Sequence, residues 1–329
     1  RCSRAVAVAL GALRIYSMDV TVILCTYNRC QSLAKALESV AHSEMPESGS
    51  WEVLVVDNNS KDATRKAVAE AAERYPGRFR YLFEPQQGKS HALNTGIRES
   101  HGKVLAFMDD DVVVDSHWLQ KLTAIFERAG WEGAGGRILP EGSFVPPRWL
   151  SVDGKYALAP LALFDLGLEP GELREPPIGT NMAFRKEVFE KLGGFRTDLG
   201  PSPGSEARSE DMEFGDRVLG AGQRLWYEPS AVVYHSLPAN RLTREYFLAW
   251  WHDKAQADLR ASGLPQDGKL RLAGVPIHLF RRLARWTLEW LTAVSEPRRF
   301  SSKLNVWMVL GEISECRRIS SGAGQQGQL

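Results

Sequence analysis

Cysteine, net charge and long apolar runs are all scarce in this 329-residue sequence. The four cysteines, Cys2, Cys25, Cys30 and Cys316, show no paired spacing, which argues against a zinc site or a disulfide framework and favours a reducing, cytoplasmic location. Lys and Arg number 41 against 40 Asp and Glu, so the chain lacks the basic excess typical of proteins that bind nucleic acid. No segment approaches the roughly 20 apolar residues that span a bilayer.

Two glycine-rich nucleotide-binding motifs are also missing. A Gly-x-Gly-x-x-Gly motif does not follow the first predicted strand, where residues 26–29 read Thr-Tyr-Asn-Arg. Gly88–Ser90 resembles the end of a P-loop, but Phe83 stands where that motif needs its first glycine. These absences argue against a dinucleotide oxidoreductase and against a P-loop enzyme.

Both ends of the chain differ from its middle. Residues 1–17 begin Arg-Cys-Ser-Arg and continue into a short apolar run. We expect this extension to be leader-like or, because no convincing cleavage site precedes Met18, to be sequence upstream of the natural start. Residues 320–329 are polar, and we expect them to form a disordered tail.

Apolar, β-branched runs alternate with helical patterns in the first third of the chain. The runs predict strands and the patterns between them predict helices, at Val20–Cys25, Gln31–Ala41, Glu52–Val56, Lys61–Tyr75, Arg80–Phe83, Ser90–Ser100 and Val104–Met108. This alternation predicts an α/β fold with a mostly parallel central sheet flanked by helices. Ligands bind such sheets at the carboxyl ends of the strands.

The pattern becomes less regular after Trp118. Glycine and proline are dense between residues 130 and 147, which predicts loops. Helices are expected at Arg185–Leu192 and Asp211–Ala221, and a strand at Ala231–Tyr234. Beyond Leu242 the sequence is helical and aromatic. We therefore expect a main domain over residues 18–242 and a helical C-terminal extension over residues 243–319.

Three consecutive aspartates, Asp109, Asp110 and Asp111, end the fourth predicted strand. Side chains alternate along an extended backbone, so Asp109 and Asp111 are predicted to point one way and Asp110 the other. Two carboxylates on one side suit a hard divalent cation that is bound together with substrate phosphates. A solvated acidic turn explains the same residues, and the run by itself leaves both interpretations open.

A second acidic pair, Glu210 and Asp211, opens a predicted helix after Ser209. Carboxylates in a first helical turn are stabilised by the helix dipole, and Ser209 suits an N-cap position. The functional alternative is a general base. His235 ends a predicted strand, where a lone histidine is more often structural than a ligand, unless the fold brings it to the aspartates.

Taken together, the motifs between Val20 and His235 resemble the family-two glycosyltransferases, inverting enzymes of the GT-A fold with a nucleotide-binding half and an acceptor half. The segments that carry the resemblance occur in family-like order and spacing: Val22–Arg29, Val55–Ser60, Asp109–Asp111, Gly179–Arg185 with Leu192–Phe195, Glu210–Asp211 with Gly222, and Val233–His235. The sequence departs from the pattern at Leu93, where many members carry arginine near the nucleotide.

The resemblance implies a role for each matching residue. Asp211 with Glu210 would be the catalytic acidic pair, and Asp111, Asp109 and His235 would bind Mn²⁺ or Mg²⁺. The remaining implied assignments are a donor and acceptor loop at Gly179, Thr180 and Asn181, and donor-nucleotide contacts at Thr26, Tyr27, Asn28, Arg29, Asp57, Asn59, Lys89, Asn94, Asp109 and Asp110.

The implied reaction is metal-dependent transfer of a hexose from a nucleotide-diphosphate sugar, with inversion at the anomeric carbon. Among such donors we expect a UDP-sugar. The acceptor would be a hydroxyl of a glycan or lipid-linked saccharide in cell-surface polysaccharide synthesis. Two alternatives are a non-catalytic nucleotide-sugar or glycan binder on the same scaffold and a sugar-phosphate nucleotidyltransferase. The four retained carboxylates argue against the first, and the missing glycine-rich loop argues against the second.

A basic, aromatic segment lies between Lys269 and Lys303, with eight Lys or Arg against two Glu. A helix starting at Pro276 would combine these cations with Trp286 and Trp290. One interpretation is a peripheral contact with an anionic membrane surface, at the inner face of the cell membrane. The other is that the aromatic stripe packs on the catalytic domain and the arginines are solvated.

Overall fold

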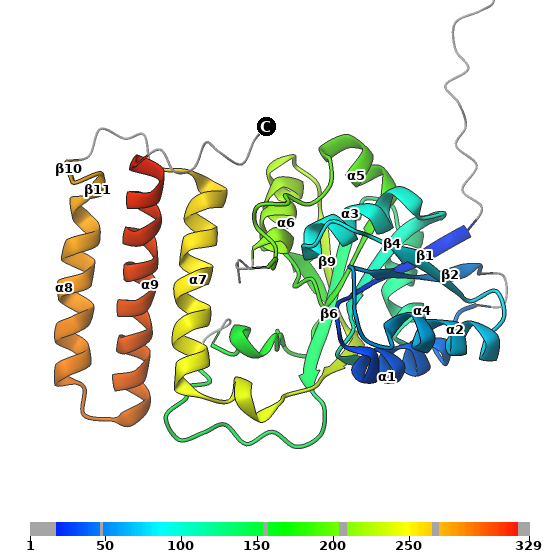
Figure 1. Cartoon of the computed structure of the whole chain (residues 1–329), viewed down its shortest axis with the longest axis horizontal. Coiled ribbons are helices and arrows are strands. Elements are labelled where there is room, and N and C mark those ends of the chain that lie inside the picture. Colours follow the sequence, from blue (N-terminus) through cyan, green and yellow to red (C-terminus); the bar gives the residue numbers. More distant parts are fainter. Residues whose placement is uncertain (1–17, 47–48, 154–156, 204–208, 265–269, 322–329) are drawn as a thin grey trace, which may run out of the picture.

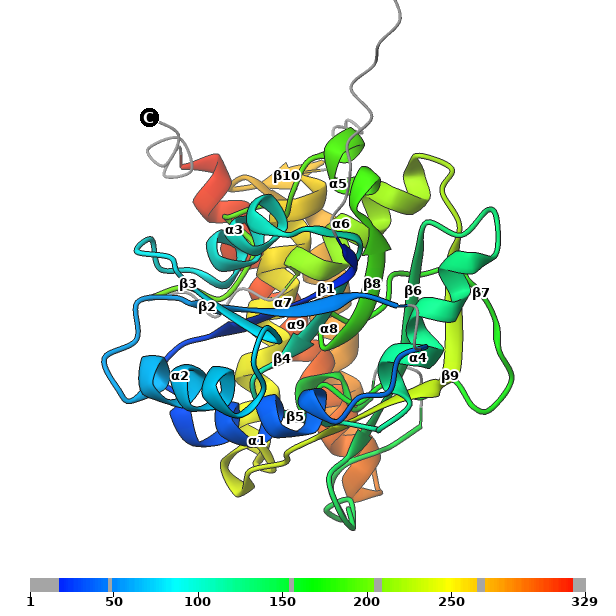
Figure 2. The same cartoon turned by 90° about the vertical axis from the view of Figure 1, so that its right-hand side faces the viewer.

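The computed structural model describes residues 18–46, 49–153, 157–203, 209–264 and 270–321. The expectations for residues 1–17 and for the tail beyond Ser321 lie outside these described residues. A central sheet has helices on both faces, and three long helices stand beside it (Figure 1). Turned by 90°, the molecule shows α1 and α2 on one face of the sheet and α3, α5 and α6 on the other (Figure 2).

The first part of the chain alternates strand and helix as predicted. Its elements are β1 (Met18–Thr26), α1 (Cys30–Ala41), β2 (Trp51–Asp57), α2 (Thr64–Arg74), β3 (Phe79–Phe83), α3 (Lys89–Glu99) and β4 (Gly102–Asp109). Every residue of β2 is buried, as expected for a strand covered by helices on both faces. The prediction of an α/β fold is confirmed, with element ends that differ by up to three residues.

The second part adds shorter elements that extend the sheet. They are β5 (Val112–Val114), α4 (Trp118–Thr123), η1 (Ala124–Glu127), β6 (Gly133–Pro140), η2 (Ala159–Leu161), β7 (Gly171–Leu173), β8 (Asn181–Arg185), α5 (Lys186–Leu192), α6 (Glu210–Gly220), β9 (Leu225–His235) and η3 (Ala239–Arg241). The strand order is β3-β2-β1-β4-β8-β6-β9-β5, with β7 paired to β9. The sheet is parallel from β3 to β4 and becomes mixed at β8, which pairs antiparallel with β4 and β6.

The prediction of loops between residues 130 and 147 was wrong for Gly133–Pro140, which form strand β6. The glycines there let neighbouring strands and side chains approach β6 closely. A Cβ added at Gly133 would lie 2.5 Å from the ring of Phe184, and one at Gly136 would collide with the carbonyl of Ala231 on β9. Local sequence cannot separate such a glycine from a turn glycine, because the neighbouring strand is what excludes a side chain.

Aromatic rings fix the helix that carries the second acidic pair. Phe214 of α6 stacks on Phe189 with ring centroids 4.5 Å apart, and it meets Phe184 and Phe195 at 5.0 and 4.9 Å. Phe107 of β4 joins the same cluster through Phe189 and Phe195. The rings hold the first turn of α6 against the sheet, close to the end of β4.

Three helices form the C-terminal region, α7 (Arg244–Ser262), α8 (Ile277–Thr292) and α9 (Glu296–Ser320), with a small hairpin of β10 (Arg271–Leu272) and β11 (Val275–Pro276). Helix α9 lies between α7 and α8 (Figure 1). A Cβ at Gly311 would collide with the carbonyl of His252, so glycine lets α9 approach α7 closely. Buried Glu315 pairs with Arg260 across the same interface, at 3.1 Å. Among the described residues, no helix combines the length and apolar character needed to cross a membrane.

Candidate active site

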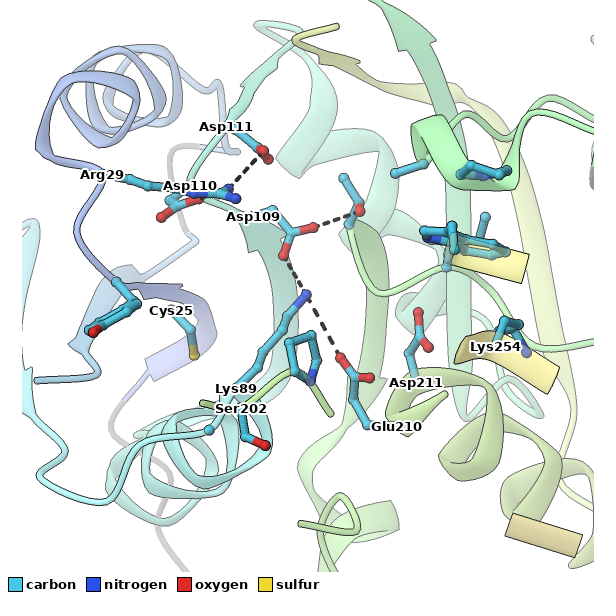
Figure 3. Close-up of a pocket in the computed structure, with 18 of the residues that line it drawn as sticks. Cys25, Arg29, Lys89, Asp109, Asp110, Asp111, Ser202, Glu210, Asp211 and Lys254 are labelled. Carbon is cyan, nitrogen blue, oxygen red and sulfur yellow. Dashed lines mark hydrogen bonds and ion pairs between the residues drawn. The ribbon is translucent and has the colours of Figure 1, made fainter. Parts of the chain in front are cut away.

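A cavity of about 910 Å³ lies at the carboxyl ends of β1, β2 and β4. Its other walls come from α3, the start of α6 and one face of α7. The acidic run Asp109–Asp111 and the pair Glu210–Asp211 both line it, although about 100 residues separate them in sequence (Figure 3). The fold therefore brings together the two acidic motifs on which the sequence analysis placed the chemistry.

Asp109 is the last residue of β4 and is bound from two sides. Its Oδ1 accepts a hydrogen bond from the Lys89 ammonium at 2.7 Å, and its Oδ2 accepts one from Thr180 Oγ1 at 2.7 Å. Burial would raise the pKa of Asp109, but the nearby Lys89 offsets this effect and lowers the pKa below its ordinary value. Asp109 is thus held as a carboxylate between α3 and the loop before β8.

Asp110 and Asp111 share one cation, contrary to the predicted alternation. Arg29 Nη1 lies 3.1 Å from Asp110 Oδ1 and 2.9 Å from Asp111 Oδ2. The alternation fails because β4 ends at Asp109 and the next two residues form a turn, so the period of an extended backbone no longer applies. Asp110 also accepts a hydrogen bond from Thr26 Oγ1 at 2.7 Å. Burial, reinforced by Asp111, raises the pKa of Asp110 to about 6.

Asp111 also contacts the last residue of β9 and a residue of η3. Its Oδ1 lies 3.3 Å from Nε2 of His235, and its Oδ2 lies 3.3 Å from a guanidinium nitrogen of Arg241. Burial alone would raise the pKa of Asp111, but His235, Arg29 and Arg241 hold it well below the ordinary range. His235 is itself buried, and its Nδ1 has no hydrogen-bond partner among the described residues. The fold has therefore brought the lone histidine to the aspartates.

Lys89 connects the two acidic motifs. Its ammonium lies 2.7 Å from Asp109 and 3.9 Å from Glu210 Oε1. Burial would lower the pKa of Lys89, but the carboxylates of Asp109 and Glu210 more than offset this and raise it. For Glu210, burial and the adjacent Asp211 raise the pKa to about 7. One partly buried ammonium thus lies between carboxylates of the sheet and of α6.

Asp211 is oriented by backbone amides. The N–H of Gly179 donates to its Oδ2 at 2.7 Å, and the N–H of Met212 donates to its Oδ1 at 2.8 Å. A Cβ at Gly179 would lie 3.0 Å from that same Oδ2, so a larger residue there would displace the carboxylate slightly. The carboxylate is held in a fixed orientation at the cavity wall.

Several residues predicted to contact the donor do not line the cavity. Asp57 accepts hydrogen bonds from Tyr81 and from the backbone of Ser60, both at 2.8 Å. Asn94 bonds the backbone N–H and carbonyl of Phe195. Asn28 and Asn59 also lie outside the wall, where both bond Lys61 and Asn59 also bonds Pro85. Of the predicted donor and acceptor loop, Thr180 lines the cavity, whereas Gly179 and Asn181 do not. The Asn181 side chain bonds Trp118, Arg137 and Ala231. These residues support the walls.

Arg241 and the α7 wall of the cavity were not predicted from the sequence. The cavity face of α7 presents Tyr246, Trp250, Trp251, Lys254 and Asp258. Their spacing matches one face of a helix, and that was the available signal. The motifs that carry the resemblance end at His235, before α7 begins. They therefore did not predict that this face of α7 lies at the cavity.

The fold is of the GT-A type. The mannosyltransferase PcManGT from Pyrobaculum calidifontis, solved with GDP-Man and Mn²⁺, shares the fold with a TM-score of 0.55 and 22% identity, covering 94% of this chain and 77% of that chain. GalNAc-T7, solved with UDP, GalNAc and Mn²⁺, gives a TM-score of 0.56 and 15% identity, covering 92% and 57%.

The family assignment follows from the sequence. The family model for glycosyl transferase family 2 matches residues 21–193, more than half of the chain, and this protein belongs to that family. It is similar to the succinoglycan biosynthesis protein ExoM of Rhizobium meliloti, with 28% identity over 78% of this chain and 81% of the relative. It is also similar to the glycosyltransferase AglE of Haloferax volcanii, with 27% identity over 69% and 70%.

Proposed function

We propose that this protein transfers a hexose from a nucleotide-diphosphate sugar to a hydroxyl of a saccharide acceptor, with inversion at the anomeric carbon. The observation that carries the proposal is that Asp211 lines the same cavity as Asp109, Asp110 and Asp111. The name of ExoM refers to succinoglycan biosynthesis, which supports a role in polysaccharide synthesis. UDP-sugars are the first donors to test and GDP-mannose the second, because these nucleotides accompany the two structural neighbours.

Asp111 and His235 fit a divalent cation. Their facing atoms are 3.3 Å apart, close to the roughly 3 Å between neighbouring ligands on an octahedral ion with bonds of about 2.1 Å. No group of three or more His, Cys, Asp or Glu in the described part of the chain is arranged to hold a metal ion alone. Donor phosphates and water would complete the coordination of Mn²⁺ or Mg²⁺. When bound, the ion supplies Lewis-acid stabilisation to the leaving diphosphate.

The chain's own groups account for the remaining steps. Asp211 accepts the proton of the acceptor hydroxyl as that oxygen attacks the anomeric carbon, and the amides of Gly179 and Met212 keep the carboxylate in place. Arg29 and Arg241 place positive charge beside Asp111, where the diphosphate would lie. Asp109 bonds Lys89 and Thr180, so we assign it to positioning these two groups more than to direct metal binding.

A screen of nucleotide sugars tests this function directly. With Mn²⁺ or Mg²⁺ present, the matching donor is expected to raise the unfolding temperature, because it binds only the folded state, and to release free nucleoside diphosphate. Pyrophosphate release from a nucleoside triphosphate and a sugar phosphate would identify a nucleotidyltransferase instead. Stabilisation without turnover in the presence of a saccharide panel would identify a non-catalytic binder.

We also propose that the end of the α8–α9 hairpin contacts an anionic membrane at the cytoplasmic face. Phe280, Leu283 and Trp286 pack into an apolar cluster with α9, so the predicted aromatic stripe is largely internal to the C-terminal region. Three other side chains at the hairpin end remain exposed, Leu288 at 63%, Leu291 at 71% and Val294 at 95%. The exposed arginines Arg281, Arg285, Arg298 and Arg299 lie along the same hairpin. Apolar side chains bordered by cations are typical of interfacial contacts.

The membrane proposal predicts that the full chain sediments with vesicles containing phosphatidylserine at low salt and dissociates at high salt. Combined replacement of Leu288, Leu291 and Val294 by serine is expected to abolish sedimentation without loss of stability, because these side chains pack on little. A matched control is serine at Val145 and Leu168, which are 84% and 72% exposed on the catalytic domain. Wild-type protein that stays in the supernatant at low salt would show the proposal to be wrong.

A further inference from the structure

Two faces of helix α7 have different surroundings, one packed against α9 and the other lining the cavity. On one face Leu248 and Ala255 are buried, and Gly311 of α9 approaches this face closely. The other face lines the cavity with Tyr246, Trp250, Trp251, Lys254 and Asp258. A helix needs only one apolar face to be held in place, so the aromatic residues on the cavity face require a separate explanation.

Trp250 and Trp251 are not part of the described core. Their rings meet edge to face, with centroids 5.0 Å apart and planes at 81°. Both side chains are partly exposed at the cavity, and neither belongs to the two apolar clusters formed by the described residues. Within that part of the chain, neither indole N–H has a hydrogen-bond partner. Two large rings that the fold leaves available in a cavity favour a ligand with an apolar face and hydroxyl groups.

The α7 wall is chemically distinct from the strand-end wall. Arg29, Lys89 and Arg241 supply positive charge around Asp109–Asp111, which suits a diphosphate. The cavity face of α7 carries one cation, Lys254, and this ammonium is already paired with Asp258. The nucleotide end of a donor therefore belongs at the strands, and the α7 wall is left for an uncharged group.

Asp211 lies between these two walls. In Figure 3 its carboxylate is drawn between Asp109 and Lys254. Asp258 also accepts a hydrogen bond from Ser209 Oγ at 2.8 Å, so α7 is attached to the residue that precedes the acidic pair. A ligand stacked on α7 would be held at a fixed position relative to Asp211.

We propose that Trp250 and Trp251 form the acceptor subsite and stack on the apolar face of a pyranose ring, with its hydroxyls toward Lys254 and Asp258. This inference rests on the proposed glycosyl transfer and adds where the saccharide acceptor binds and that its terminal sugar is neutral. The rings orient the acceptor hydroxyl toward Asp211 and take no part in proton transfer. Tryptophan faces suit the C–H groups of a sugar because the ring face is electron-rich.

The test uses the full chain, the donor found in the screen, and tetrasaccharides of glucose, galactose and mannose as acceptors. Trp250→Ala and Trp251→Ala are each expected to raise the acceptor KM by about tenfold, the loss expected for one stacked ring. Donor KM and the slow hydrolysis of the donor by water are expected to stay unchanged. Trp250→Phe should recover much of the acceptor affinity and guards against misfolding of the alanine variant. Trp290→Ala is the matched control, because Trp290 packs against Trp307 outside the cavity.

The outcomes separate this inference from the function on which it rests. Absence of nucleoside diphosphate release by the wild-type protein, with every donor and with the saccharides present, would reject the proposed transfer itself. Normal hydrolysis with a changed donor KM in the tryptophan variants would assign the rings to the donor and overturn the acceptor subsite. An unchanged acceptor KM, or wild-type transfer to octanol or a seryl peptide with none to the saccharides, would overturn it as well.

Discussion

Asp211→Asn is expected to lower turnover by at least about 100-fold, the effect typical of losing a general base. The amide keeps the shape of the side chain and can still accept a hydrogen bond from one of the two amides that orient Asp211, but it cannot take the acceptor's proton. Donor binding should persist, because the cations beside Asp109–Asp111 are untouched. Steady-state kinetics and donor-induced thermal stabilisation measure the two effects separately.

The neighbouring carboxylates supply the controls for this prediction. Asp216→Asn changes a residue of the same helix that does not line the cavity and should leave turnover near normal. Glu210→Gln removes a buried group whose pKa burial raises to about 7 and whose nearest cation is Lys89, so we expect a smaller loss than for Asp211→Asn. Full loss in Glu210→Gln with near-normal transfer in Asp211→Asn would show that Glu210 is the base.

Chelation is expected to abolish transfer, and Mn²⁺ or Mg²⁺ should restore it. Asp111→Ala should weaken metal-dependent donor binding by at least about 100-fold, above the 10–100-fold typical for groups that only support a metal ligand. Asp110→Ala should cost less, because Asp110 contacts Thr26 and Arg29, whereas Asp111 faces His235. Titrations of donor binding at several metal concentrations measure both variants.

Comparing Asp110→Ala with Asp111→Ala also tests why the two variants are expected to lose different amounts of donor binding. Both carboxylates share Arg29, so loss of that shared ion pair alone would affect the two alanine variants to the same extent. Equal losses, or transfer that survives complete chelation, would contradict the proposed metal site. His235→Ala offers a second measurement, because it should raise the metal concentration needed for donor binding and leave the charge of the aspartates unchanged.

The nucleotide-binding half of the fold could be predicted from local sequence. Strands β1, β2 and β4 read as apolar, β-branched runs because helices bury both of their faces, and the acidic run follows directly at the end of β4. Strand β6 could not be predicted this way. Its glycines are required by Phe184 and Ala231, which are distant in sequence, and they resemble turn glycines when read alone.

The candidate site, like the fold, could be predicted from the sequence only in part. The sequence by itself determined the chemistry available: the three aspartates, the acidic pair at the start of α6, and a histidine ending β9. Only the tertiary structure decided how they face one another. A turn after Asp109 replaced the predicted alternation, and Lys89 came to lie between Asp109 and Glu210. It also decided that α7 presents Trp250 and Trp251 to the cavity and its opposite face to α9, because the packing of α9 fixes the rotation of that helix.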